Sequence, residues 1–163
     1  MRKRGWVTAA AALGLVGIAA AAGRLRRFAV VDGSMRPALE PKDWVVALRR
    51  GDKELRRGDI VIFEDPGHPE RNLVKRVVGL PGERLEIGNG QVHIDGAVLA
   101  EPWANGPTWP MDLWEIPSDS AFVLGDDRAA SSRDSRVIGP VPVSCIGWIV
   151  TTRYWPPGRF GSI

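Results

Sequence analysis

The sequence is poor in the residues that most often build metal sites and catalytic triads. It has one cysteine, Cys145, and two histidines, His68 and His93, among 163 residues. A single cysteine excludes an internal disulfide framework and a cysteine-based zinc site. Two histidines, one in a turn and one in a predicted strand, give no support to a histidine metal site or a Ser-His-Asp triad. Glycine-rich motifs for nucleotide phosphates are also missing, so we expect neither a metal nor a cofactor.

Acidic residues are absent from the first 27 positions, which hold six of the 22 lysines and arginines. Removing those six leaves 16 cations against 19 acids, a net charge of −3 for residues 28–163, although the whole chain carries +3. The basic character therefore belongs to the N-terminal segment, and we expect no nucleic-acid partner.

Three cations precede and three follow an uncharged, mostly aliphatic run from Gly5 to Gly23. Its length is close to the roughly 20 residues that cross a bilayer as a helix. The sequence predicts an N-terminal tip and a membrane anchor in residues 1–27 and a β domain in residues 28–163. A cleavable signal peptide is the alternative, but the run is long for one and arginines directly follow its small residues. Because the flanking charges are equal, they do not set the orientation.

Short runs of β-branched and aliphatic residues recur after the anchor, separated by Gly, Pro, Asp and Asn. This pattern predicts a mainly β protein, an antiparallel β domain with tight turns. Residues 97–115 hold three tryptophans without clean alternation, and we interpret them as a small insertion or a loop packed by its own aromatic residues. The predicted strands are Phe28–Val31, Trp44–Leu48, Ile60–Phe63, Leu73–Val78, Arg84–Ile87, Val92–Ile94, Phe122–Leu124 and Ile146–Thr151.

Lysine is scarce: only four of the 22 cationic residues are lysines. Of these, Lys75 alone lies in an apolar strand, where alternation places Leu73 and Val77 on its face. Loss of water lowers the pKa of a lysine, and a neutral amine can take a proton from a serine hydroxyl. A strand lysine whose charged end reaches solvent is the alternative for a lysine taken alone.

Two segments contain serines that could partner such a lysine. Ser34 follows an extended run, with Gly33 allowing close approach and Pro37 stiffening the exit. Further on, residues 125–136 combine acids, arginines and serines that can form a buried ion-pair network. Taken separately, these would be a turn serine and a solvated polar loop.

Five sequence boxes in a fixed order resemble the type I signal peptidases, which are membrane-bound Ser/Lys proteases. The resemblance covers nearly the whole chain and implies an antiparallel β domain of the signal-peptidase type with one N-terminal transmembrane helix. After the anchor, the boxes are Gly33–Leu39, Arg57–Phe63, Val74–Glu83, Phe122–Arg128 and Ser132–Arg136.

The resemblance implies that Ser34 is the nucleophile and Lys75 the general base. Many members carry a small hydroxyl residue two positions before the nucleophile, where this sequence has Asp32. Because a carboxylate would repel an oxyanion, we expect Asp32 to point away and the backbone N–H of Ser34 to be the first oxyanion donor. The substrate-adjacent residues implied by the family are Gly33, Met35 and Pro37.

The last box implies the supporting residues. Asp134 and Arg136 match family positions that stabilise the site through an ion pair. The serine that orients the lysine is Ser131 or Ser132, because the loop is one residue longer than usual. We prefer Ser132, which keeps the Ser-x-Asp-Ser-Arg pattern intact.

The implied function is removal of signal peptides from exported preproteins by cleavage after small residues in an Ala-x-Ala pattern. The implied partners are those signal peptides and membrane lipid, and the implied location is the cytoplasmic membrane, single-pass, with the catalytic domain outside. A related Ser/Lys protease with one dedicated substrate is the first alternative. A non-catalytic anchored β module is the second, and the presence of both Ser34 and Lys75 argues against it.

Overall fold

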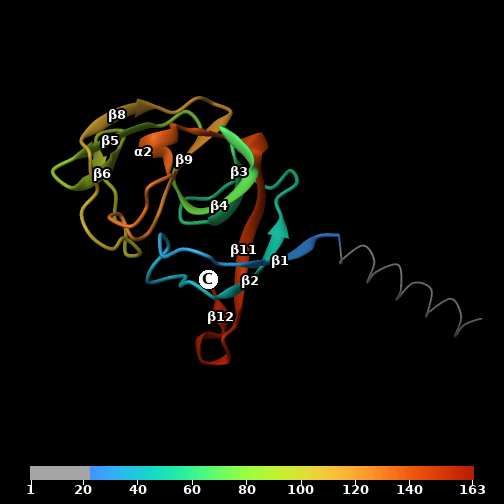
Figure 1. The fold of residues 1–163 in the computed structure, drawn as a ribbon. Helices are drawn as coiled ribbons and strands as arrows, with labels where there is room; N and C mark the ends of the chain where they lie inside the picture. Colours follow the sequence, from blue (N-terminus) through green and yellow to red (C-terminus); the bar gives the residue numbers. More distant parts are fainter. Residues whose placement is uncertain (1–22) are drawn as a thin grey trace, which may run out of the picture.

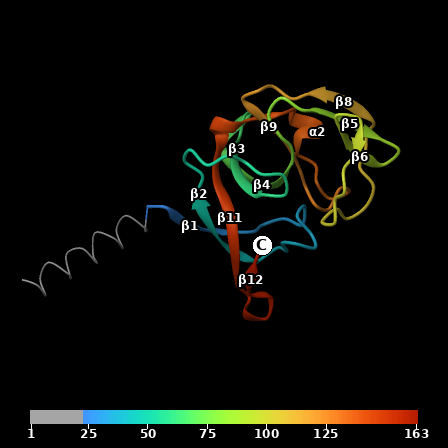
Figure 2. The ribbon, with the colours of Figure 1, turned by 180° about the vertical axis from the view of Figure 1, so that it is seen from behind.

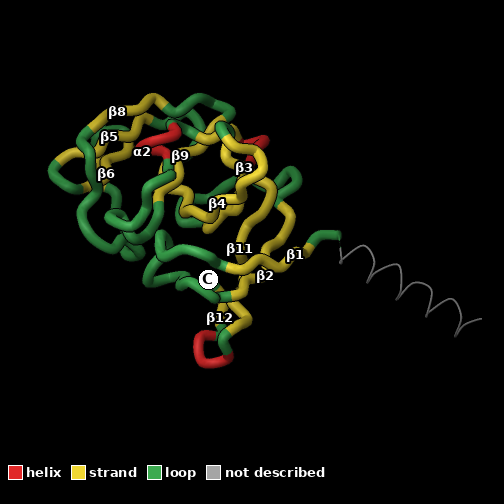
Figure 3. The backbone as a smooth tube through the Cα atoms, viewed as in Figure 1, coloured by secondary structure: helices red, strands yellow, loops and turns green. Residues whose placement is uncertain are grey.

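Antiparallel strands dominate the part of the chain that the computed structural model describes, residues 23–163 (Figure 1). Within this range the one α-helix is the short turn α2, Ser135–Ile138, and Figure 3 shows strands joined by long loops. The mainly β, antiparallel fold predicted from the sequence is therefore confirmed. The described residues include no helix of the length and apolarity needed to cross a bilayer. The predicted anchor lies, up to residue 22, outside them.

An eight-stranded sheet forms the larger part of the fold. Its order is β1–β2–β11–β3–β4–β9–β10, with β12 paired to β11. Strand β11 thus lies between β2 and β3, while β3 and β4 form a hairpin. The strands are β1 (Leu25–Ala29), β2 (Trp44–Arg49), β3 (Ile60–Asp65), β4 (His68–Gly79), β9 (Ser120–Leu124), β10 (Val141–Pro142), β11 (Ile146–Trp155) and β12 (Gly161–Ser162).

A second sheet, of four strands in the order β7–β6–β5–β8, packs against one end of the first. Two of its strands, β7 and β8, come from residues 97–115, so hydrogen bonding joins this segment to the β5–β6 hairpin. Figure 2 shows the small sheet at the end of the molecule away from β12. The strands are β5 (Arg84–Gly88), β6 (Gln91–Ile94), β7 (Ala97–Val98) and β8 (Asp112–Glu115).

Each strand predicted beyond residue 40 lies inside an observed strand, whereas the first is displaced. β1 begins at Leu25, three residues before the predicted strand, and pairs with β2 from Leu25 opposite Leu48. Its side chains are mostly exposed and include two adjacent arginines. Only Phe28 packs against the core, edge-on to Trp148. The strand is otherwise held by backbone pairing and shows no apolar alternation that a sequence pattern could reveal.

Apolar packing fixes the segment between β1 and β2. Met35 and Leu39 are fully buried and pack against Val45, Ile60 and Val150 of the large sheet. Because these two side chains anchor the segment on the core, the residues next to them have little freedom to move.

Candidate active site

Lys75 lies in β4, opposite Val61 of β3, and only 2% of its surface is exposed. Val77, two residues along the same face, is fully buried. The sequence prediction of a desolvated lysine is confirmed. Such a lysine is unusual, because an ammonium group out of water is costly unless it is paired or loses its proton.

Burial lowers the pKa of the Lys75 amine from its ordinary value of 10.5. The negative charges of Asp32, Asp134 and Asp126 oppose this shift, and the positive charge of Arg136 adds to it. Because the net direction is downward, the neutral amine is easier to reach than in an exposed lysine.

Ser34 lies in the turn that follows β1 and is 3% exposed. Its carbonyl accepts a hydrogen bond of 3.0 Å from the amide of Asp127, in the loop after β9. The buried Met35 fixes it from the other side. The serine is thus held between the core and the loop that follows β9.

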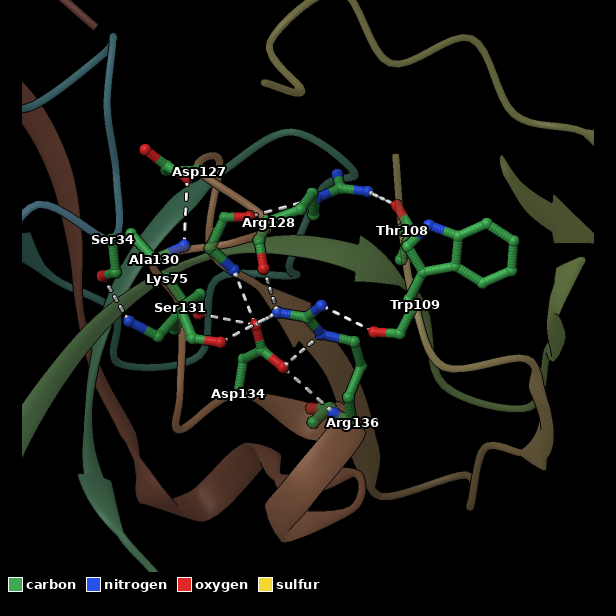
Figure 4. A network of polar contacts seen from close by, with 12 residues as sticks. Ser34, Lys75, Thr108, Trp109, Asp127, Arg128, Ala130, Ser131, Asp134 and Arg136 are labelled. Atoms are coloured by element: carbon green, nitrogen blue, oxygen red, sulfur yellow. Dashed lines mark hydrogen bonds and ion pairs between the residues drawn. The ribbon is translucent and has the colours of Figure 1, made fainter. Parts of the chain in front are cut away.

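The side chains of Ser34 and Lys75 meet in the interior (Figure 4). The Lys75 Nζ lies 2.6 Å from the Ser34 Oγ. A hydroxyl and a buried amine at this separation can exchange a proton directly, as a nucleophile and its base must.

A buried carboxylate organises the loop beside this pair (Figure 4). The Asp134 carboxylate accepts from Nε and Nη2 of Arg136, at 2.9 and 2.8 Å, and from the Ser131 hydroxyl at 2.6 Å. It also accepts from the amide of Gly125, while Arg136 donates to the carbonyl of Trp109. Burial alone would raise the pKa of Asp134, but these hydrogen bonds and the Arg136 charge hold it below its usual value.

The two candidate orienting serines lie in different surroundings. Ser131 is 7% exposed and bonded to Asp134, whereas Ser132 is exposed to solvent. A Cβ at Gly125 would lie 2.4 Å from the Ser131 Oγ and 2.7 Å from the Ser34 carbonyl oxygen. The missing side chain at Gly125 therefore lets Ser131 approach the Ser34 segment, and the preference for Ser132 has no support in this geometry.

The expectation that Asp32 points away from the site is wrong. Its Oδ1 accepts a hydrogen bond of 3.0 Å from the amide of Ser34, the same N–H expected to serve the oxyanion. The reason is local: an aspartate readily bonds to the backbone N–H two residues on. Burial raises the Asp32 pKa, but hydrogen bonds from Ser34 and the charge of Lys75 outweigh this and lower it.

The three residues that the resemblance places next to the substrate differ in burial and in their neighbours. Gly33 lies under the guanidinium of Arg36, since a Cβ there would be 3.2 Å from the Arg36 Cζ. Met35 is fully buried in the core. Pro37 lines a cavity of about 510 Å³, together with residues of the C-terminal hairpin that β11 and β12 form. The structure thus gathers Ser34, Lys75, Ser131, Asp134 and Arg136 in one network, and these three residues only flank it.

A narrow cleft of about 100 Å³ opens beside Asp32 and is mainly apolar. Neither Ser34 nor Lys75 lines this cleft or a larger cavity of about 620 Å³, but the cleft lies next to both in the chain, between Asp32 and Val74. The cleft is lined by Phe28, Ala29, Val30, Val31, Asp32, Val45, Ile62, Asn72, Leu73 and Val74.

Comparison with known proteins agrees with this arrangement. The family model described as signal peptidase, peptidase S26, matches residues 3–155. The chain belongs to the signal peptidase family.

Relatives of this peptidase include enzymes of the same kind from bacteria. Signal peptidase I of Leptolyngbya laminosa is 36% identical over 146 residues, covering 80% of this chain and 68% of that protein. Signal peptidase I of Bacillus caldolyticus is 34% identical over 149 residues, covering 80% of each. The crystal structure of a signal peptidase I from Enterococcus faecalis V583 matches with a TM-score of 0.54 and 28% identity, over 61% of this chain and 98% of that chain.

Family membership confirms two predictions made from the sequence. The resemblance to type I signal peptidases is correct, and the chain is a serine endopeptidase of the signal-peptide-processing class. Membership also places it among membrane-associated hydrolases.

Several polar contacts around the peptidase site were not foreseen. Arg76 forms a buried, two-pronged ion pair with Asp126, at 2.8 and 2.6 Å. Arg128 reaches from the loop after β9 to Glu101 at 2.6 Å and to Thr108. The polar composition of residues 125–136 had predicted an ion-pair network that includes Asp126 and Arg128. Nothing in the sequence marked Glu101 and Thr108 as their partners, because residues 97–115 meet that loop only in the folded chain.

A second group of unforeseen polar contacts joins the C-terminal hairpin to the segment between β1 and β2, which contains Ser34. Arg153 donates to the carbonyl of Ala38 at 2.6 Å. Arg159 pairs with Glu40 and with Asp43, the latter at 3.2 Å. The sequence separation of more than 100 residues explains why no local pattern could reveal these contacts.

Proposed function

We propose that this peptidase removes signal peptides from exported preproteins by a Ser/Lys mechanism, with Ser34 as nucleophile and Lys75 as general base. The observation that carries the proposal is the 2.6 Å contact between the Lys75 Nζ and the Ser34 Oγ in a buried site. The lowered pKa of Lys75 supports it, because only the neutral amine can accept the serine proton.

In the proposed reaction, Lys75 takes the Oγ proton as Ser34 attacks the scissile carbonyl carbon. The C–N bond of the tetrahedral intermediate then breaks, and Lys75 gives the proton to the leaving amine of the mature protein. Water next loses a proton to Lys75 and attacks the Ser34 ester. Breakdown of the second intermediate returns the proton from Lys75 to Ser34 and releases the signal-peptide carboxylic acid, which loses its own proton to solvent.

We propose that Ser131 orients the Lys75 amine, with Asp134 and Arg136 holding Ser131 in turn. Support comes from its burial, its 2.6 Å bond to Asp134, and the close approach that Gly125 allows. Side chains fixed in this way keep a catalytic group within the narrow range of positions that reaction requires.

Substrate enters, in this proposal, as an extended strand beside the apolar cleft. Within residues 23–163, one edge of β4 pairs with β3, but the other edge is paired with β9 only from Arg76 onward. Residues 72–74, next to Lys75, therefore present a free backbone edge suited to strand addition. The cleft there is apolar and only about 100 Å³, which supports small side chains such as alanine in an Ala-x-Ala pattern.

We also propose that the segment before β1 forms a cytoplasmic tip and a single transmembrane anchor, with the β domain on the extracytoplasmic side. Because β1 begins at Leu25, this domain starts three residues before the predicted boundary at residue 28. The uncharged run and its flanking cations support the anchor. An outside location of the catalytic domain brings it to the signal peptides of preproteins that have crossed the membrane.

Purified full-length chain in detergent micelles tests the proposed chemistry on a fluorogenic peptide carrying Ala-x-Ala. Ser34→Ala and Lys75→Arg should each reduce cleavage by about 10³-fold or more, since arginine keeps the charge but cannot act as a base. Lys53→Arg, the same change at an exposed lysine, should cleave like the wild type. Wild-type activity in Lys75→Arg would contradict the dyad.

Depletion of the protein in its host separates a general peptidase from one with a dedicated substrate. Accumulation of many uncleaved preproteins supports the general role proposed here. Accumulation of a single preprotein would replace it with the dedicated one.

A further inference from the structure

The hydrogen bond between Asp32 and the Ser34 amide conflicts with the reaction that the site performs. Attack on a carbonyl creates an oxyanion, and the backbone N–H of a serine nucleophile is a common donor to it. In this structure that N–H is already donated to the Asp32 carboxylate, at 3.0 Å. An oxyanion cannot occupy the same position beside a carboxylate, because the two charges repel.

Asp32 is placed so that it can be moved. It is an exposed residue at the edge of the cleft, and among the residues lining that cleft it is the one with a charge. The positive charge of the Lys75 amine also acts on it. A substrate strand that places a small side chain in the cleft would therefore meet Asp32, and Asp32 can turn toward solvent because it is exposed.

We infer that Asp32 is a substrate-displaced latch: its carboxylate occupies the Ser34 amide in the free enzyme, and the incoming chain turns it outward so that the amide can serve the oxyanion. This inference rests on the proposed Ser/Lys function. It makes Asp32 a positioning residue of this chain, acting through Ser34 and Lys75 and not on the scissile bond.

Movement of Asp32 would also change the pKa of Lys75, the proposed base. Lys75 is faced by Asp32 from the turn after β1, by Asp126 from the loop after β9, and by Asp134 and Arg136 around α2. Among these, Asp126 and Asp134 keep their own arginine partners, whereas Asp32 leaves when substrate binds. Loss of that negative charge lowers the pKa of Lys75 further, so displacement of the latch and release of the lysine proton occur together.

Two variants separate the hydrogen bond from the charge. Asp32→Ala removes both, while Asp32→Asn keeps an oxygen that can accept from the Ser34 amide. With the fluorogenic Ala-x-Ala peptide and full-length enzyme in micelles, Asp32→Ala should lower KM roughly tenfold, the factor that one charge-assisted hydrogen bond is worth, without lowering kcat. Asp32→Asn should change KM less.

Both variants should move the acidic limb of the kcat/KM–pH profile to lower pH. Glu86→Gln, which removes one exposed carboxylate from the small sheet, should leave KM and the limb unchanged. An unchanged KM in Asp32→Ala, a fall in its kcat, or an unmoved limb in both variants would each overturn the latch. The wild type and Ser34→Ala are measured in the same assay as controls. If neither cleaves the peptide faster than buffer alone, the proposed Ser/Lys function is wrong. If the wild type cleaves it and Ser34→Ala does not, the function holds and the Asp32 variants test the latch by itself.

Discussion

At the scale of single residues, burial decides which of several similar groups can take part in chemistry. Ser131 and Ser132 are neighbours in the sequence, but only the first is buried and bonded to Asp134. Lys75 and Lys53 differ in the same way, one enclosed by a strand pair and the other exposed. The pKa of Lys75 is lowered because its surroundings, not its residue type, remove water.

Alanine substitution of the two serines tests their roles. Ser131→Ala should lower kcat roughly ten- to a hundredfold, the cost of losing one buried hydrogen bond near the reacting groups. Ser132→Ala, a matched change on the exposed neighbour, should stay within about twofold. Peptide cleavage under saturating substrate measures both, and the opposite ranking would restore the preference for Ser132.

Asp134 should also stabilise the fold in a pH-dependent manner. Its folded-state pKa lies below the ordinary value of 3.8, so its stabilisation is present above about pH 4 and is lost as the pH falls through the folded value. Asp134→Asn should lower the free energy of unfolding by about 3–5 kcal/mol at neutral pH, because Arg136 is left buried without its partner. Urea unfolding followed by tryptophan fluorescence measures the difference, which should shrink below pH 4. A difference that is constant from pH 7 to pH 3 would contradict this linkage.

At the scale of elements, β4 connects the site to both sheets. Its free edge borders the cleft, Lys75 lies at its centre, and its last residue, Gly79, pairs with Phe122 of β9 where the small sheet packs. The C-terminal hairpin has a comparable role on the other side, where Arg153 and Arg159 hold the segment after Ser34. Elements distant in sequence thus fix Ser34 and Lys75, the two residues of the proposed catalytic pair.

Gly79 is the point at which close packing of the sheets can be tested. A Cβ there would lie 2.3 Å from the Ile116 Cδ1 and 2.9 Å from the Phe122 Cβ, whereas a Cβ at Gly147 in β11 would meet nothing within 4 Å. Gly79→Ala should reduce the free energy of unfolding by about 1–3 kcal/mol through overpacking, and Gly147→Ala by less than about 0.5 kcal/mol. Thermal unfolding of the two variants checks this; equal stability would show that the sheet junction yields to an added methyl group.

At the scale of the whole molecule, charge is divided between two parts of the chain. Six cations without an acid lie in residues 1–27, and residues 28–163 are net negative. The basic segment, residues 1–27, favours the surface of an anionic membrane. The net negative charge of residues 28–163 gives that domain no electrostatic attraction for nucleic acid. This division supports the proposed anchor.

Protease protection in whole host cells tests the proposed sidedness. If residues 28–163 lie outside, protease added to cells with a permeable or removed outer layer but an intact cytoplasmic membrane should digest an epitope tag placed after residue 163. A tag placed before residue 1 should be digested only after that membrane is opened. The reverse pattern would overturn the orientation.

Much of the fold and part of the site could be predicted because their signals are local. Alternation and turn residues identified strands such as Ile60–Phe63 and Leu73–Val78, and an apolar face around Lys75 indicated its burial. The edge strand β1 was placed three residues late, because its first three residues are exposed and only Phe28 packs against the core. Likewise, β7 and β8 lie in a segment without alternation and form only by pairing with β6 and β5.

The sequence by itself determined the chemical groups of this peptidase: a serine in a turn, a lysine in an apolar strand, and the oppositely charged pair Asp134 and Arg136. Only the tertiary structure decided which serine is buried beside Asp134 and that Asp32 turns inward onto the Ser34 amide. The physical reason is that residue type fixes what a group can do, whereas burial, partner and pKa depend on chain segments far away in the sequence. Ser34 and Lys75 are 41 residues apart, and the 2.6 Å between their side chains exists only in the folded sheet.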